Sequence, residues 1–205
     1  MQRSASVGRA ARLGALVLVG LGVGVATALL QGQLGQPWLS LVNAASPWLA
    51  PMFILGTLWQ RPTRAALAGV ATGLLELLGY FVTAAAHGYT PADHTSLLFW
   101  AVCALIGGPI FGTAGWLWWR RNRLLSALGG ACLPAAFFAE GGVVYGWELH
   151  YDSTALLFFA LGLVLLAVLG LRGWQHRLIG LWLLVALPAG VAAELLLGLV
   201  YSQAL

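Results

Sequence analysis

Three glutamates lie inside long apolar runs of this chain: Glu76, Glu140 and Glu194. A carboxyl group in apolar surroundings costs free energy, so its presence there suggests a function. Such groups can bind a cation, exchange a proton or hydrogen-bond a neighbouring helix. Four aromatic residues are expected close to them: Tyr80, Tyr145, Tyr201 and Trp100. A cationic ring held between carboxyl and aromatic faces is physically sensible, so these side chains are the predicted ligand-binding residues.

The spacing from the preceding arginine gives the depth of each glutamate in a helix. Glu140 and Glu194 both lie seventeen positions after an arginine, and Glu76 lies twelve positions after one. At about 1.5 Å per residue, Glu140 and Glu194 would be about 25 Å along their helices. That is the outer third of a hydrocarbon core about 30 Å thick. We therefore expect the three carboxyls to converge in the outer half of a helix bundle.

No basic side chain is expected at this depth, so the glutamates lack an internal cationic partner. Either they are protonated, or they face water or a bound cation. A protonated carboxyl bonded to backbone or to a hydroxyl, such as Thr72 beside Glu76, would be structural. Three carboxyls at related positions favour a shared polar cavity. Pro134 and Pro188, each six positions before a glutamate, free backbone carbonyls that could face it.

A second group of polar residues falls in the expected outer loops: His87, Asp93, His94, Glu148, His150 and Asp152. Imidazole and carboxylate would suit Zn²⁺ or Ni²⁺, but the spacing matches no strong metal motif, and solvated loops collect such residues. We therefore predict no metal and no cofactor. The chain also lacks a zinc-protease helix motif, a nucleophile elbow and a nucleotide-binding glycine loop. We expect no enzyme, unless a glutamate acts as acid or base.

The elements that must position these residues are membrane helices. Only 8% of the residues are charged and 60% are hydrophobic, whereas soluble domains are about 25% charged. All ten basic residues are arginines, in four groups at the ends of apolar segments: Arg3, Arg9 and Arg12; Arg61 and Arg64; Arg120, Arg121 and Arg123; Arg172 and Arg177. This pattern indicates cytoplasmic loops and contact with the lipid bilayer, and no nucleic-acid partner.

The fold prediction is an all-α integral membrane protein of about seven transmembrane helices, forming one membrane domain over residues 1–205. The N-terminus would be inside and the C-terminus outside a bacterial plasma membrane. The second segment is short, and the fourth should be broken at its Gly-Gly-Pro sequence, residues 107–109. The expected spans are residues 13–30, 44–59, 65–86, 97–119, 124–145, 154–171 and 178–201.

A tandem repeat of two-helix units is also predicted. Residues 93–101 and 152–160 are identical at six of nine positions. Leu-Pro-Ala at 133–135 and at 187–189 each precede an Ala-Glu pair by the same spacing. The repeat units would be 44–90, 91–145 and 152–205, with residues 13–30 as an additional N-terminal helix. Such parallel repeats recur in transporters, and convergence of apolar sequence is the alternative.

The sequence resembles two known groups of proteins. Asn43-x-x-Ser46-Pro-Trp48, the run from Phe99 to Gly112 and Ala139-Glu140-Gly together resemble an uncharacterised family of small bacterial multi-pass membrane proteins. More distantly, residues 61–79 resemble substrate-binding S-components of energy-coupling-factor vitamin transporters. That resemblance implies an outer pocket and a membrane protein partner that meets the glycine-rich first helix, through Gly20 and Gly24 or through Gly22 and Ala26.

The leading functional prediction is a membrane protein that binds a small cationic or heteroaromatic molecule from the outer face and serves transport. A non-catalytic membrane accessory or assembly subunit, whose glutamates hydrogen-bond helices together, is the alternative. A membrane enzyme is the third reading. A pocket open to the outside would favour the first, and a solidly packed bundle with satisfied carboxyls the second.

Overall fold

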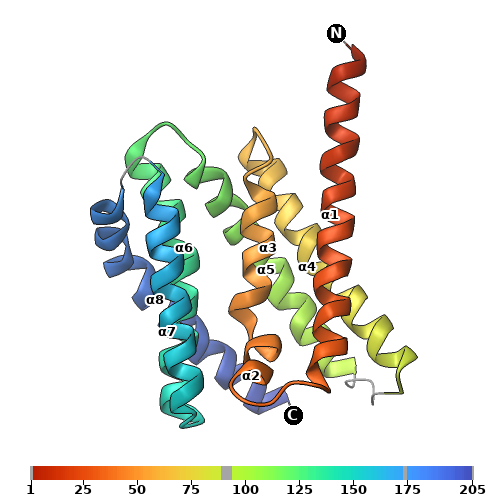
Figure 1. Ribbon diagram of the computed structural model, residues 1–205, viewed down its shortest axis with the longest axis vertical. Coiled ribbons are helices and arrows are strands. Elements are labelled where there is room, and N and C mark those ends of the chain that lie inside the picture. The colour runs from red at the N-terminus through yellow and green to blue at the C-terminus, as the bar shows by residue number, and fades with distance from the viewer. Residues whose placement is uncertain (1, 89–93, 173–174, 205) are drawn as a thin grey trace.

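The computed structural model describes residues 2–88, 94–172 and 175–204, and all regular structure in these ranges is helical. Figure 1 shows one bundle of helices arranged side by side. This confirms the prediction of an all-α fold. The elements are α1 (Gln2–Gln31), α2 (Trp38–Asn43), α3 (Ala45–Gly56), α4 (Pro62–Ala86), α5 (His94–Trp118), α6 (Arg123–Glu140), the π-helix η1 (Gly141–Glu148), α7 (Asp152–Leu171) and α8 (His176–Ala204).

Six helical segments in the described ranges are long and apolar enough to cross a membrane. They are Gly8–Gln31, Pro62–Ala86, Ser96–Trp118, Arg123–Glu148, Asp152–Leu171 and His176–Val200. The predicted second span is different, because α3 has only 12 residues. At 1.5 Å per residue it is about 18 Å long, which is shorter than a hydrocarbon core of about 30 Å.

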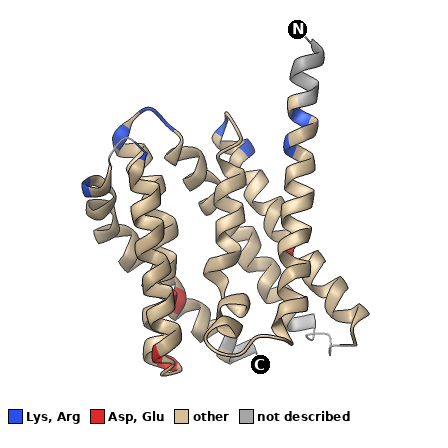
Figure 2. Cartoon of the chain, viewed as in Figure 1, with Lys and Arg blue, Asp and Glu red and all other residues tan. Residues whose placement is uncertain are grey.

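The arginines among the described side chains gather at one end of the bundle, as Figure 2 shows in blue. We call this the arginine end and the opposite one the far end. The helix α1 starts at the arginine end and finishes at the far end, while α8 finishes at the far end (Figure 1). The chain therefore returns to the arginine end between α1 and α4, through α2 and α3 together. The α2–α3 pair thus acts as one passage through the bundle, and the chain makes an odd number of passages in all.

The break in regular structure lies at Ala44, between α2 and α3, where the backbone is extended. The break predicted at residues 107–109 is wrong, since α5 is helical from His94 to Trp118 with Pro109 inside it. The glycines there serve close packing instead. A Cβ on Gly108 would come within 2.6 Å of the Val70 backbone, so α4 and α5 approach closely only because the side chain is missing.

Local signals fix two of the helix starts at the arginine end. Pro62 occupies the first turn of α4, where its missing N–H and fixed φ are favourable. The Asn122 side chain accepts hydrogen bonds from the backbone N–H groups of Leu124 and Leu125 at the start of α6, as an N-cap does. Both helices therefore begin directly after an arginine-bearing turn.

The bundle has two halves that share α3. One half contains α1, α4 and α5, and the other contains α6, η1, α7 and α8. The helix α3 contacts α4 and α5 on one side and α6 on the other, and α5 also contacts α6. Figure 1 shows α3 and α5 at the centre of the bundle with the other helices to either side. The α2–α3 pair is therefore placed to connect the two halves.

A network of polar contacts closes the arginine end. The Arg172 guanidinium donates to the carbonyl oxygens of Trp118, Trp119 and Arg120 at the C-terminus of α5, and lies 4.4 Å from the ring centroid of Trp119. Ser126 of α6 donates to the Trp118 carbonyl. A cation on the last carbonyls of a helix is stabilised by the helix dipole. This network joins α5, α6 and α7 away from the glutamates.

Candidate functional site

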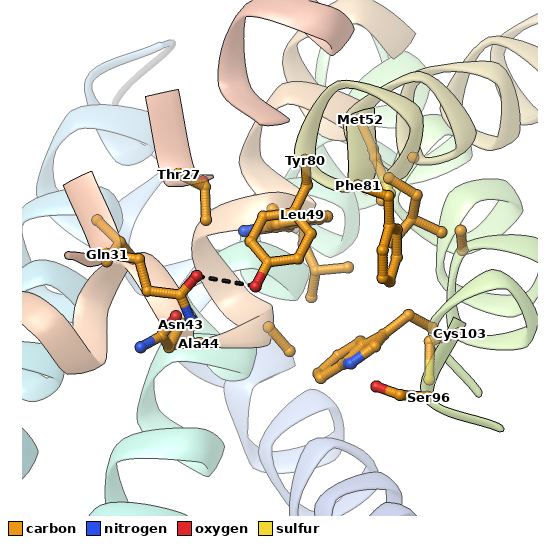
Figure 3. Close-up of a pocket in the computed structure, with 17 residues that line it drawn as sticks. Thr27, Gln31, Asn43, Ala44, Leu49, Met52, Tyr80, Phe81, Ser96 and Cys103 are labelled. Atoms are coloured by element: carbon orange, nitrogen blue, oxygen red, sulfur yellow. Dashed lines mark hydrogen bonds between the residues drawn. The ribbon is translucent and has the colours of Figure 1, made fainter. Parts of the chain in front are cut away.

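A cavity of about 240 Å³ lies toward the far end of the first half. Its walls come from α1, the α2–α3 junction, α4 and α5 (Figure 3). Most of the lining is apolar. The polar and aromatic lining residues are Thr27, Gln31, Asn43, Trp48, Tyr80, Phe81, Ser96, Trp100 and Cys103. An apolar cavity with a few convergent polar groups is the usual form of a small-molecule site.

Aromatic rings from three helices define the cavity. The Tyr80 hydroxyl donates to the Gln31 side-chain oxygen at 2.8 Å, which fixes the ring (Figure 3). Trp48 of α3 lies edge-on to Tyr80, with ring centroids 6.0 Å apart. Phe81 meets Tyr80 edge-on at 5.2 Å. The third helix is α5, from which Trp100 lines the cavity. Of the predicted ligand-binding residues, Tyr80 and Trp100 line this cavity.

Glu76 lies on α4 next to residues that line the cavity, without lining the cavity itself. Its side chain is 0% exposed, and neither carboxyl oxygen has a hydrogen-bond partner within the described residues. The cavity is lined by Gly73, Leu77 and Tyr80 of the same helix, so Glu76 is within one turn of lining residues on either side. Thr72, which sequence spacing offers as a partner, donates instead to the Ala68 carbonyl at 2.8 Å. Glu76 is thus a buried polar group that its own surroundings do not satisfy.

Glu140 has the opposite environment. It is 4% exposed, and its two carboxyl oxygens accept hydrogen bonds from the backbone N–H groups of Ala45 at 2.8 Å and Ser46 at 2.7 Å. These are the first donors of α3, which no intrahelical carbonyl satisfies. A carboxylate on two N–H groups at a helix N-terminus is a charge-assisted cap. Glu140 therefore holds the beginning of α3 from the other half of the bundle.

Two further contacts tie the same segment to the second half. The Tyr145 hydroxyl of η1 donates to the Ser40 carbonyl of α2 at 3.2 Å. The Thr154 hydroxyl of α7 donates to the Gln36 side chain at 3.4 Å. We call Glu140, Tyr145 and Thr154, with the backbone and side-chain groups that they contact in residues 36–46, the α2–α3 latch. Because Asn43, Ala44 and Ala45 line the cavity, the latch positions one wall of it.

Glu194 lies on α8, where its carboxyl is half-buried and interacts electrostatically with Glu140 and Glu148. The Tyr145 hydroxyl also interacts electrostatically with Glu140 and Glu194. The structure therefore brings Glu140, Glu194 and Tyr145 together in the second half, and Tyr80 and Trp100 together in the first half with Glu76 behind them. The predicted residues thus form two groups, and Glu194 links them through its electrostatic interaction with Cys103, which lines the cavity. The Tyr201 side chain lies outside the described residues.

The polar residues of the expected loops do not form a metal centre within the described part of the chain. No three of the described His, Cys, Asp and Glu side chains lie close enough to hold an ion. His87 contacts the Thr83 carbonyl at 2.9 Å and His150 contacts the Gly146 carbonyl at 3.2 Å, each through Nδ1. Glu148 and Asp152 are exposed. Asp93 and the His94 side chain lie outside the described residues.

The predicted partner surface on α1 is partly used inside the bundle. A Cβ on Gly20 would come within 2.7 Å of the Leu75 side chain, and one on Gly24 would collide with the Glu76 backbone. Both glycines thus pack α1 against α4. Gly22 and Ala26 are exposed, so the alternative pair remains on the open face of the helix.

Sequence reasoning missed several lining residues, among them Gln31, Asn43 and Trp48. Gln31 is the last residue of α1 and Asn43 the last of α2, so nothing in the local apolar pattern marks either one. Trp48 reads equally well as an interfacial anchor. The available signal was the Asn43-x-x-Ser46-Pro-Trp48 sequence, which coincides with the helix break and the cavity wall.

Comparison with known proteins gives a family and no activity. The sequence model of a family of unknown function (DUF6518) matches residues 3–201, nearly the whole chain. No curated protein and no solved structure matches the chain. The distant likeness to S-components therefore receives no support from these comparisons.

Proposed function

The chain belongs to this family of unknown function, and we propose that it is a plasma-membrane protein that binds a small heteroaromatic or cationic molecule in the cavity of its first half, from the far end, and serves its transport. The observation that carries the proposal is the cavity itself. It combines aromatic faces from α3, α4 and α5 with hydrogen-bonding groups from α1 and α2.

The size of the cavity narrows the ligand. Its volume of about 240 Å³ is below the ~300–1,000 Å³ typical of sites for drug-sized molecules. A molecule of one or two rings is therefore expected. Trp48, Tyr80 and Trp100 offer ring faces and edges for stacking, and the Gln31 and Asn43 amides can orient a polar substituent. The α2–α3 junction is a discontinuous helix, which in membrane transporters commonly forms the binding site.

An accessory or assembly role is the second candidate, and Glu140 favours it. Its carboxylate is fully used in capping α3, which is the structural role that the alternative assigns to a buried glutamate. In this reading the exposed Gly22 and Ala26 of α1 would pack against a membrane protein partner. The cavity would then be a packing defect within the first half.

Native mass spectrometry of the protein released gently from its own membranes tests the proposal. The expected result is a bound molecule of a few hundred daltons that is lost in a Cys103→Phe variant, in which the larger side chain fills the cavity. Cys132→Phe is the matched control, because Cys132 lies on α6 outside the cavity, and it should retain the molecule.

Either of two results would overturn the proposal. A bare protein in wild type would leave the cavity without a ligand. A molecule retained equally by both phenylalanine variants would place the binding site elsewhere. If the protein is instead released with another membrane protein and nothing else, the accessory role becomes the better explanation.

A further inference from the structure

The charge of the ligand can be inferred from what surrounds the cavity. Ala44 and Ala45 line it at the N-terminus of α3, where backbone N–H groups would normally attract an anion. The N–H groups of Ala45 and Ser46 are already bonded to the Glu140 carboxylate. An anionic ligand would therefore meet a negative side chain at this wall instead of free donors.

A second buried carboxyl, Glu76, lies on α4, whose residues Gly73, Leu77 and Tyr80 also line the cavity. Both Glu76 oxygens are buried without a hydrogen-bond partner in the described residues, and lining residues flank Glu76 on α4. A buried carboxyl without partners is costly, and a positive charge in the adjacent cavity would lower that cost. An anion would raise that cost, and a neutral molecule could lower it only by donating a hydrogen bond.

Cationic side chains of the described residues are far from this cavity. The arginines lie at the arginine end (Figure 2), whereas the cavity lies toward the far end. His87 and His150 are exposed and do not line the cavity. The aromatic side chains Trp48, Tyr80 and Trp100 add the negative faces of their rings, which attract cations. Among the described residues, the ionisable groups beside the cavity are thus carboxyls, and its remaining polar lining is neutral.

From these observations we infer that the cavity admits cations and rejects anions, so that its ligand is a cationic one- or two-ring molecule. The inference rests on the proposed function and gives the ligand its charge. Glu140 acts in two ways, by positioning the wall and by filling its anion site. Glu76 supplies a carboxyl without a partner of its own, whose charged form a cation in the cavity would stabilise.

The chain offers a direct test, because it has two cysteines and Cys103 lines the cavity. A Cys132→Ala variant leaves Cys103 as the only thiol. Methanethiosulfonates form a disulfide with a thiol and release methanesulfinate. Three reagents of similar size cover the charges: aminoethyl (cationic), sulfonatoethyl (anionic) and hydroxyethyl (neutral) methanethiosulfonate. Modification rates are followed by intact-protein mass and divided by the rate of each reagent with free mercaptoethanol.

The expected result is a normalised rate for the cationic reagent about tenfold or more above that for the anionic one, as nearby carboxyls that ionise beside a cation would produce in a partly desolvated site. Glu76→Gln and Glu140→Gln, each in the Cys132→Ala background, should lower this ratio by about threefold or more. Glu148→Gln is the matched control. It removes an exposed carboxyl of η1 and should leave the ratio unchanged.

The neutral reagent separates the possible failures. Equal normalised rates for all three reagents would overturn the charge inference and leave an accessible cavity for the proposed function. No modification by any reagent, the neutral one included, would overturn both, because the cavity would be closed. If Glu140→Gln keeps the neutral-reagent rate, a lowered ratio of cationic to anionic rates reflects the lost charge and not unfolding. If Glu148→Gln lowers this ratio as well, the assignment to Glu76 and Glu140 is overturned.

Discussion

Glu76 and Glu140 are both buried, but their carboxyl groups have different hydrogen-bond partners. Glu140 accepts two backbone hydrogen bonds at the start of α3, and Glu76 accepts none within the described part of the chain. Sequence alone cannot separate them, since both are single glutamates in apolar helices. The comparison teaches that burial of a carboxyl is not by itself evidence of function. What distinguishes a structural carboxyl from an available one is the set of donors that reaches it.

The same contrast extends to the two halves of the bundle. The half with α1, α4 and α5 is held by close contacts at Gly24, Gly69 and Gly108, and it contains the cavity. The half with α6, η1 and α7 holds the α2–α3 segment through the polar contacts of the latch. The cavity walls made by α1, α4 and α5 therefore depend on missing side chains, and the wall made by the α2–α3 segment depends on hydrogen bonds in a low-dielectric interior.

The largest expected effect is at the latch. Glu140→Leu should destabilise the protein by about 2–4 kcal/mol, because it leaves the N–H groups of Ala45 and Ser46 buried without an acceptor. Reversible unfolding by SDS titration in mixed micelles measures this change. Glu140→Asp, which keeps the charge at a shorter reach, should recover part of the loss. A Leu variant as stable as wild type would mean that the cap contributes nothing.

Packing at α1 should come next. Gly24→Ala is expected to cost about 1–3 kcal/mol, because the new Cβ collides with the backbone of α4 and the helices must separate. Gly22→Ala, two positions away with nothing within 4 Å, should be neutral or stabilising by up to about 1 kcal/mol through helix propensity. The same SDS titration compares the two. Equal effects would contradict the close α1–α4 contact.

Glu76→Leu should change stability in the opposite direction to Glu140→Leu. Replacing an unpartnered buried carboxyl by an apolar side chain of similar volume should stabilise the protein by about 1 kcal/mol. The same variant should weaken binding of whatever cation occupies the cavity. A loss of stability as large as that of Glu140→Leu would show that Glu76 has a structural partner, and the contrast between the two glutamates would disappear.

The smallest effects come from two tyrosine hydroxyls. Tyr145→Phe removes the bond to the Ser40 carbonyl in the latch and should cost about 1 kcal/mol. Tyr80→Phe removes the bond to Gln31 beside the cavity, where water can replace it, and should cost about 0.5 kcal/mol or less. Unfolding midpoints compare them, and a larger loss for Tyr80→Phe would place the main polar contact in the first half.

The helical membrane fold and the arginine end could be predicted from the sequence, because apolar length and charge position are properties of single segments. Glu140 could be singled out, but its partners could not. They are backbone N–H groups that lie 95 and 94 positions away. Because nearly every residue has such a group, the amino-acid sequence does not mark which ones will bind Glu140. Gly20 and Gly24 likewise predict a close helix contact without saying which helix provides it.

The predicted tandem repeat remains a prediction. It places Glu140 and Glu194 at corresponding positions on α6 and α8, but equivalent sequence positions have here acquired different surroundings. Glu140 is enclosed by α3, whereas Glu194 is on α8, in which Ile179 near the start of the helix is the only buried residue among those described. The position of a helix at the edge or centre of the bundle decided this difference, and that position is not encoded within a single repeat unit.

The cap of α3 also has a consequence for biosynthesis. Its acceptor is Glu140, which is synthesised 95 residues after Ala45. At translation rates of about 5–20 residues per second, roughly 5–20 s pass between the two. During that interval the nascent α2–α3 pair must satisfy its N-terminal donors with water or lipid headgroups at the membrane surface. The α2–α3 pair can therefore reach its final position only after α6 has emerged from the ribosome. Folding of the first half is thus completed by synthesis of the second half.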